Sequence, residues 1–361
     1  MGGVLVSLAW ALATLALSSP TLPREYLCFR ATGEIRIDGR LDDPAWATAP
    51  WTEDFVDIEG HKRPKPRYRT RAKMLWDDRF LYIGAELEEP HVWATLTRRD
   101  SVIFQDNDFE VFLDPDGDTH QYYELEMNAL NTLWDLMLIK PYRDGGPAVF
   151  HWDYRRIRTA VHVEGTLNDP KDEDRGWTIE IAIPWNDLFE HQSQIPQDDS
   201  PPPTPWRPSE GTTWRLNFSR VEWDVEVANG SYRKVQGRPE HNWVWSPQGA
   251  IDMHRPEQWG YLQFTEKPPA DARFVPDPAK PARQALHRFY YAARAYRERH
   301  GSWPRTWKEA GLTDPPPAEV LSFRVHTTPS LYEARATVRY PDGTTHVWVL
   351  LNDSKILEVK K

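Results

Sequence analysis

Hydrophobic and polar residues alternate with a period of two through much of the segment 105–136. Phe109, Val111 and Leu113 occupy every second position of a first run, which is typical of a strand with one face in a core. The turn-forming sequence 115–118 (P-D-G-D) follows, and a second alternating run covers residues 122–128. We therefore predict two or three antiparallel strands in this segment.

The polar face of these predicted strands is unusually acidic. It carries Asp108, Glu110 and Asp114 on the first run and Glu124 and Glu126 on the second. Because a solvated strand face is also polar, the pattern by itself predicts a sheet and only suggests a binding site.

Similar patterns predict a mainly β protein. Further strands are expected at residues 26–31, 72–76, 80–88, 160–164, 176–184, 213–223 and 260–264. Short helical turns are expected near Trp46 and at residues 185–189.

The pattern changes after residue 265. Residues 266–281 contain five prolines and are interpreted as a linker. Apolar residues then follow helical spacing over residues 282–300, and His300-Gly301 is a typical helix end. Runs at 332–340, 345–351 and 356–359 predict three strands. Residues 282–361 are therefore predicted to form a small αβββ module, to which the sequence assigns no role.

Two further segments fall outside this scheme. Residues 4–17 are apolar apart from Ser7 and Thr14 and are too short to span a bilayer, so residues 1–18 are predicted to be a signal peptide. We accordingly expect a secreted, periplasmic or cell-envelope protein without a membrane span in the mature chain.

Residues 191–210 contain six prolines and are expected to form an insertion loop rather than a strand.

Composition narrows the choice of ligand. The net charge of −10 argues against a nucleic-acid partner, because binding to phosphate backbones draws on clustered Lys and Arg. The single cysteine, Cys28, excludes an intrachain disulfide. The chain has 18 tryptophans; most are expected in the core, and a few are expected to face a ligand.

At residues 106–115 (D-N-D-F-E-V-F-L-D-P) and 122–128 (Y-Y-E-L-E-M-N), the sequence resembles the central strands of family 9 carbohydrate-binding modules. Further pieces agree in the same order, at residues 37–46, 72–85, 177–185, 214–223, 245–249 and 253–264. The resemblance implies a jelly-roll-like β-sandwich over residues 26–265, followed by the small α+β module. It also implies that the chain binds a poly- or oligosaccharide.

The resemblance also implies where a sugar would lie. The family holds a terminal sugar between two tryptophans; Phe104 stands at the first of these positions and Met253 near the second. The family's strand carboxylate is retained as Glu110 and its asparagine as Asn217, whereas a family arginine is replaced by Glu124, which reverses the charge.

Sugar rings stack on aromatic faces through their C–H groups, and their hydroxyls bind carboxylates, amides and guanidinium groups at the rim. Residues of both kinds occur near the implied site. The candidate carbohydrate-binding residues are Phe104, Glu110, Glu124, Asn217, Arg220, Trp223, Trp245, His254 and Arg255.

An acidic turn is a candidate metal site. Asp114, Asp116 and Asp118 alternate on one tight turn, and Ca²⁺ prefers such oxygen ligands. The family often carries structural calcium, but this turn lacks the distal Glu of a full EF-hand loop, and acidic turns are commonly just solvated. The histidines show no zinc-binding spacing.

Three functions remain open from the sequence. The first is an exported, non-catalytic carbohydrate-binding protein. The second is a cell-envelope scaffold that binds a protein partner through the C-terminal module. The third is a hydrolase acting on glycosidic bonds, because family members are often attached to glycoside hydrolases in carbohydrate catabolism. No catalytic motif is present, so the sequence favours the first.

Overall fold

The computed structural model describes residues 23–188 and 207–359. The predicted signal peptide and most of the predicted proline-rich insertion lie outside the described residues, so both stay predictions.

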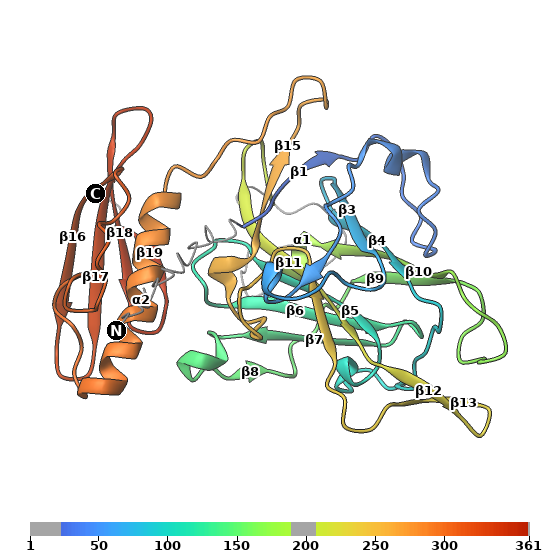
Figure 1. Ribbon diagram of the computed structural model, residues 1–361. Helices are drawn as coiled ribbons and strands as arrows, with labels where there is room; N and C mark the ends of the chain where they lie inside the picture. Colours follow the sequence, from blue (N-terminus) through green and yellow to red (C-terminus); the bar gives the residue numbers. More distant parts are fainter. Residues whose placement is uncertain (1–22, 189–206, 360–361) are drawn as a thin grey trace, which may run out of the picture.

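The larger part of the chain is a curled β-sandwich built from one 13-stranded sheet (Figure 1). The strands run in the order β8-β7-β6-β5-β11-β15-β1-β3-β4-β10-β9, and β14 joins β11 to β2. Both neighbours of β1 are parallel to it, and the other pairs are antiparallel. The predicted mainly β sandwich is therefore confirmed. Its strands are β1 (Glu25–Arg30), β2 (Val56–Asp57), β3 (Thr70–Trp76), β4 (Phe80–Glu88), β5 (Asp108–Asp114), β6 (Tyr122–Asn128), β7 (Leu133–Leu138), β8 (Ala148–Val149), β9 (Arg158–Glu164), β10 (Gly176–Pro184), β11 (Thr213–Glu222), β14 (His241–Val244) and β15 (Gly260–Thr265).

Shorter elements decorate the sandwich. A separate hairpin, β12 (Val225–Ala228) and β13 (Ser231–Lys234), projects from it. The helical elements are α1 (Trp185–Leu188) and the 3-10 turns η1 (Pro44–Thr48), η2 (Gly60–Lys62), η3 (Ile103–Gln105), η4 (Tyr142–Asp144) and η5 (Pro256–Gln258). Loops that carry η3, η4 and η5 border the outer face described below.

The main core lies on the inner face of the sheet. Phe109, Val111 and Leu113 of β5 are at most 1% exposed and belong to this core, together with Leu125 and Met127 of β6. The period of two in the sequence therefore corresponds to the two faces of the sheet, one in the core and one outside it. The residues between these positions point the other way, toward the acidic outer face.

The C-terminal module contains one more strand than predicted. The helix α2 (Lys280–His300) packs on a four-stranded antiparallel sheet of β16 (Val320–Thr327), β17 (Tyr332–Arg339), β18 (Thr345–Leu351) and β19 (Ile356–Glu358). The pattern of β16 is weak because a register shift between Val320 and Ser322 interrupts its alternation. The helix also begins inside the predicted linker, since Pro281 is tolerated in its first turn.

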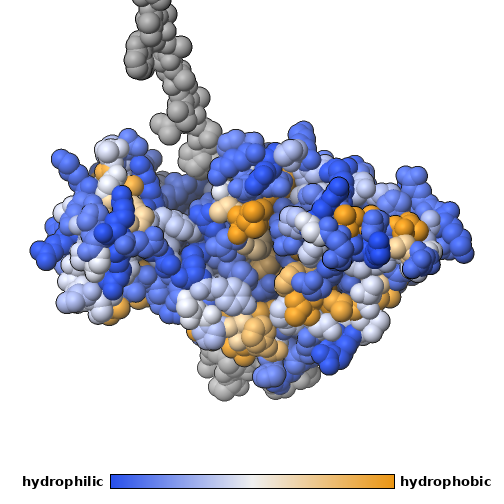
Figure 2. All heavy atoms as spheres, turned by 60° about the horizontal axis from the view of Figure 1, so that its bottom comes forward, coloured by the Kyte–Doolittle hydropathy of each residue, from blue (hydrophilic) through white to orange (hydrophobic). Residues whose placement is uncertain are grey.

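Polar contacts join this module to the sandwich. In Figure 1, α2 lies between the small sheet and the sandwich. Asp144 accepts hydrogen bonds from the Tyr290 hydroxyl (2.5 Å) and the Ser354 hydroxyl (2.8 Å), and the Ile356 N–H donates to the Asp118 carbonyl (3.1 Å). Figure 2 shows the two parts as adjoining lobes with mainly hydrophilic surfaces.

Among the described residues, no helix combines the length and the apolar character that crossing a membrane requires.

Candidate functional site

The outer face of the sheet aligns polar side chains from four neighbouring strands. Ser219 on β11, Glu110 on β5, Glu126 on β6 and Trp134 on β7 are direct cross-strand partners in one row. Direct partners project to the same side of a sheet, with Cβ atoms about 5 Å apart. The register thus places two carboxyl groups side by side, with an aromatic ring at one end of the row.

A pocket of about 220 Å³ lies over this face. Its aromatic lining consists of Phe104, Phe112, Trp134 and Tyr142. Its polar lining consists of Glu110, Glu124, Glu126, Glu240, Asn242 and His254. The pocket therefore combines ring faces with hydrogen-bonding groups.

Backbone contacts fix Phe104 at one side of the pocket. Its N–H donates to Glu126 Oε2 (2.9 Å), and its carbonyl accepts a hydrogen bond from Trp223 Nε1 (2.9 Å). The Lys234 ammonium lies 3.4 Å from the centre of the Trp223 ring. Trp223 therefore holds the turn at Phe104 in place, and the Lys234 ammonium covers a face of the Trp223 ring.

Tyr142 and His254 form another side of the pocket. Their rings meet edge to face at 4.5 Å, and Tyr142 remains 46% exposed. His254 Nδ1 lies 2.9 Å from the Tyr122 hydroxyl. Burial, assisted by the positive charge of Arg143, lowers the pKa of His254 to about 3, so this ring is neutral at ordinary pH.

An aromatic pair, half-buried Trp134 and exposed Phe150, borders the pocket. The Trp134 ring stacks on Phe150 with a centroid distance of 6.1 Å and an angle of 12° between planes. Phe150 is 52% exposed, which is unusual for a phenylalanine outside a binding surface.

The carboxyl groups of this face are buried, and their pKa values rise as a result. Burial raises the pKa of Glu110 to about 7 against the opposing hydrogen bond from Ser219. Burial and then the neighbouring charge of Glu110 raise the pKa values of Asp108, Glu124 and Glu126 well above their usual range. In the described part of the chain, no Lys, Arg or His forms an ion pair with any of the four.

The structure brings four of the predicted site residues into this pocket: Phe104, Glu110, Glu124 and His254. Trp223 lies directly behind Phe104. The remaining predicted residues lie elsewhere.

Asn217 and Trp245 are buried away from the pocket. Asn217 is 0% exposed and its amide donates to the carbonyl of Ser246 (2.8 Å), so it joins β11 to the loop that follows β14. Trp245 is also 0% exposed and lies in the main core, with its Nε1 donating to Glu53 (3.1 Å). A ring enclosed in this way offers no face for a sugar.

Arg220 and Arg255 also serve other contacts. Arg220 has the parity of the core residue Phe218, so it points away from the outer face, and it is 0% exposed. Arg255 lines a different pocket, between the sandwich and the C-terminal module. Their positions in the sequence suggested that both lie near the site. Strand parity directs Arg220 away from it, and packing between the two modules separates Arg255 from it.

Sequence reasoning missed seven residues that line the pocket: Phe112, Glu126, Trp134, Tyr142, Val221, Glu240 and Asn242. The first two share the parity of Glu110 and Glu124, so the alternation already contained their signal. Trp134 and Tyr142 reach the pocket through the cross-strand register of β7 and through the turn η4, which no local pattern reveals.

The predicted calcium turn does bring its three aspartates together, with oxygens within 4.8 Å of one another. However, both oxygens of Asp114 accept backbone N–H groups, from Gly117 (2.9 Å) and Thr119 (3.0 Å). The Lys355 ammonium lies 3.0 Å from Asp118. These residues fit a capped turn docked on the C-terminal module better than an ion site, and calcium here stays an untested prediction.

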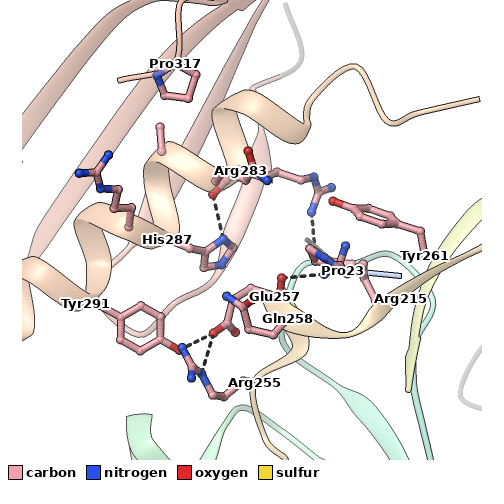
Figure 3. A pocket seen from close by; sticks show the side chains of 14 residues that line it. Pro23, Arg215, Arg255, Glu257, Gln258, Tyr261, Arg283, His287, Tyr291 and Pro317 are labelled. Carbon is pink, nitrogen blue, oxygen red and sulfur yellow. Dashed lines mark hydrogen bonds and ion pairs between the residues drawn. The ribbon is translucent and has the colours of Figure 1, made fainter. Parts of the chain in front are cut away.

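A second pocket, of about 380 Å³, lies between the modules (Figure 3). In Figure 3, Glu257 and Arg255 from the sandwich point toward Tyr291 of α2. Arg255 Nε donates to the Tyr291 hydroxyl (2.9 Å), and Glu257 forms ion pairs with Arg143 (3.0 Å) and Arg255 (3.5 Å). Burial alone would raise the pKa of Glu257, but Arg143, His287 and Arg255 outweigh it and lower the pKa to about 2. Its charged groups therefore fasten the two modules together.

Replacing Glu257 is expected to loosen this junction. Glu257→Gln should cost about 2 kcal/mol of unfolding free energy at pH 7, because two arginines lose a buried charged acceptor. Since the folded pKa lies below the ordinary value of 4.5, this contribution is complete above about pH 4.5 and disappears as pH falls toward 2. Denaturant unfolding at several pH values measures it. Glu226→Gln, which breaks an exposed pair with Arg233, is the matched control and should cost below about 1 kcal/mol.

The β-sandwich thus carries an outward-facing pocket lined by aromatic rings. Residues 37–200 match the family described as carbohydrate family 9 binding domain-like. The resemblance seen in the sequence is thereby confirmed over these residues.

A region of 152 residues is 23% identical to the exoglucanase XynX of Acetivibrio thermocellus. It covers 42% of this chain and 12% of that protein, so the chain matches about an eighth of its length.

Two solved structures are among those that match this chain. A family 9 carbohydrate-binding module from Caldicellulosiruptor kristjanssonii in complex with cellotriose is 16% identical, with a TM-score of 0.42 over 70% of this chain and 100% of that one. A putative carbohydrate-binding protein from Bacteroides uniformis is 17% identical, with a TM-score of 0.48 over 67% of this chain and 99% of that one.

Proposed function

We propose that this chain is an exported, non-catalytic protein that binds a glycan, or the end of one, in the outer-face pocket. The observation that carries the proposal is the pocket itself, where four aromatic residues surround buried carboxyl groups on the exterior of the sandwich. The family match over residues 37–200 supports it.

The two kinds of lining residue suit a sugar ring. Apolar C–H faces of a sugar pack on aromatic rings such as Phe104 and Tyr142, which are held by their own contacts before any ligand arrives. Hydroxyl groups need donors and acceptors around the ring, and Glu110, Glu124 and Asn242 provide them. Rings that are fixed in advance lose little entropy on binding.

A pocket of this size holds about one sugar unit, and the adjoining Trp134–Phe150 pair, of which Phe150 is exposed, is available to a second. The chain end of a glycan, or a short oligosaccharide, is therefore a better ligand than the middle of a long crystalline chain.

A glycan array with the mature protein, from about Ser19 onward, tests the proposal. We expect binding to at least one oligosaccharide, weakened about tenfold by Phe104→Ala, which corresponds to a lost ring contact of about 1.4 kcal/mol. Phe274→Ala, which removes a half-buried ring in the linker, is the matched control and should bind normally.

A blank array with folded protein would contradict the proposal. Release of shortened products from the bound glycan would contradict its non-catalytic part.

A further inference from the structure

We propose that Asp108, Glu110 and Glu126 bind one divalent cation of the calcium class at the floor of the outer-face pocket. This site is separate from the acidic turn at Asp114. Its existence does not require that the pocket bind a glycan.

The geometry allows one ion to contact all three carboxyl groups. Each offers an oxygen, and these oxygens lie within 4.8 Å of one another. Calcium–oxygen distances are about 2.3–2.6 Å, so ligands on opposite sides of one ion are separated by about 5 Å. Asp108 and Glu110 project from the same face of β5, and Glu126 is the direct partner of Glu110 on β6. The sheet register therefore fixes the three ligands on rigid strands.

An unpartnered oxygen points to a missing ligand. Asp108 is 0% exposed; its Oδ1 accepts the N–H of Val221 (2.9 Å), whereas its Oδ2 has no hydrogen-bond partner. Glu124, beside the cluster, likewise has an unpartnered buried oxygen, Oε2. Leaving a buried acceptor without a partner is unfavourable, and more so for a charged group.

The contrast with the other acidic clusters is informative. Within the described residues, three groups of acidic side chains come close enough to hold an ion. In the group around Asp135, Arg99 lies 2.5 Å from the carboxylate, and in the turn group Lys355 lies 3.0 Å from Asp118. Each of those clusters thus has its own basic partner. The Asp108 cluster has none and is also the group whose three members are all buried.

The ligand types define the class of ion. Three carboxylates and no nitrogen or sulfur ligand favour a hard cation such as calcium over zinc or copper. Calcium takes six to eight oxygen ligands, so several positions remain for water. Because Glu110 and Glu126 also line the pocket, these positions face its interior.

One consequence rests on the proposed function. Two neighbouring sugar hydroxyls could replace water on the ion, so that a positive charge, and not only aromatic rings, would hold the glycan. Glycan affinity should then fall at least tenfold when the ion is removed.

Titration of the chelated full chain with calcium chloride, without any glycan, tests the site. We expect one bound ion per chain and a rise in the thermal unfolding midpoint. Asp108→Asn should lower calcium affinity at least tenfold. Asp116→Asn, a change of the same kind in the acidic turn, should leave it unchanged.

The outcomes are distinct. No heat and no thermal shift with the wild-type chain at millimolar calcium would overturn the site, whatever the variants do. Loss of binding in Asp116→Asn with retention in Asp108→Asn would overturn it by placing the ion at the turn. Calcium binding with a blank glycan array would support the ion site and contradict the glycan proposal. Glycan binding without calcium binding would support the glycan proposal and contradict the ion site.

Discussion

Replacing Arg220 with alanine is expected to lower the free energy of unfolding by about 3–5 kcal/mol. The guanidinium is 0% exposed and bridges Glu89 (2.7 Å) and Glu222 (2.8 Å), which are themselves buried. It also donates to the Thr70 hydroxyl (3.0 Å) and the Glu88 carbonyl (2.9 Å). Without it, two carboxylates would face each other in the protein interior, where burial and the charge of Glu222 already raise the pKa of Glu89.

Denaturant unfolding followed by tryptophan fluorescence measures this loss. Arg238→Ala is the matched control, because Arg238 forms a surface pair with Asp224 and is 63% exposed; its removal should cost below about 1 kcal/mol. Equal effects of the two substitutions would show that the buried network does not stabilise the sandwich. Unchanged glycan binding by a folded Arg220 variant is also expected, since Arg220 does not line the pocket.

The second large effect concerns pH. The pKa of Glu110 is raised from 4.5 to about 7, so the folded chain holds this proton more tightly than the unfolded chain. Below about pH 4.5 the carboxyl group is protonated in both states and costs nothing. Between about pH 4.5 and 7 the unfolded chain loses this proton while the folded chain keeps it, so stability falls as pH rises. Raising the pKa of Glu110 from 4.5 to about 7 corresponds to a loss of about 3 kcal/mol in the free energy of unfolding.

Glu110→Gln should remove this loss, because an amide does not ionise. We expect the wild-type chain, kept in a chelator, to lose about 3 kcal/mol more than the variant between about pH 4.5 and 7.5. The free energy of unfolding at a series of pH values gives both curves. Parallel curves would contradict the raised pKa. Calcium should suppress the wild-type loss if the ion binds at the Asp108 cluster.

Local pattern was enough to predict most of the fold. The strand expected at residues 176–184 is β10, and the apolar positions of β5 lie in the core as the alternation requires. Such alternation is a property of neighbouring residues and follows directly from strand geometry. The weak strand β16 was missed because a register shift disturbed that same pattern.

The candidate site was predictable only in part. Glu110 and Glu124 lie on the same face of the sheet, and the alternation of residues within each strand already indicated this face in the sequence. The burial of Trp245 in the core could not be predicted from the sequence, because its ring is covered by Tyr26 and Phe218 from distant parts of the chain. The sequence alone does not distinguish a tryptophan that faces solvent from one that is buried in a core.

The sequence by itself determined the class of fold, the family resemblance and the acidic character of one sheet face. Only the tertiary structure decided which of those acidic groups are buried together, which have basic partners, and which aromatic rings border them. The physical reason is that parity depends on adjacent residues, whereas burial and ion pairing depend on register across several strands and on loops that meet only in the folded chain.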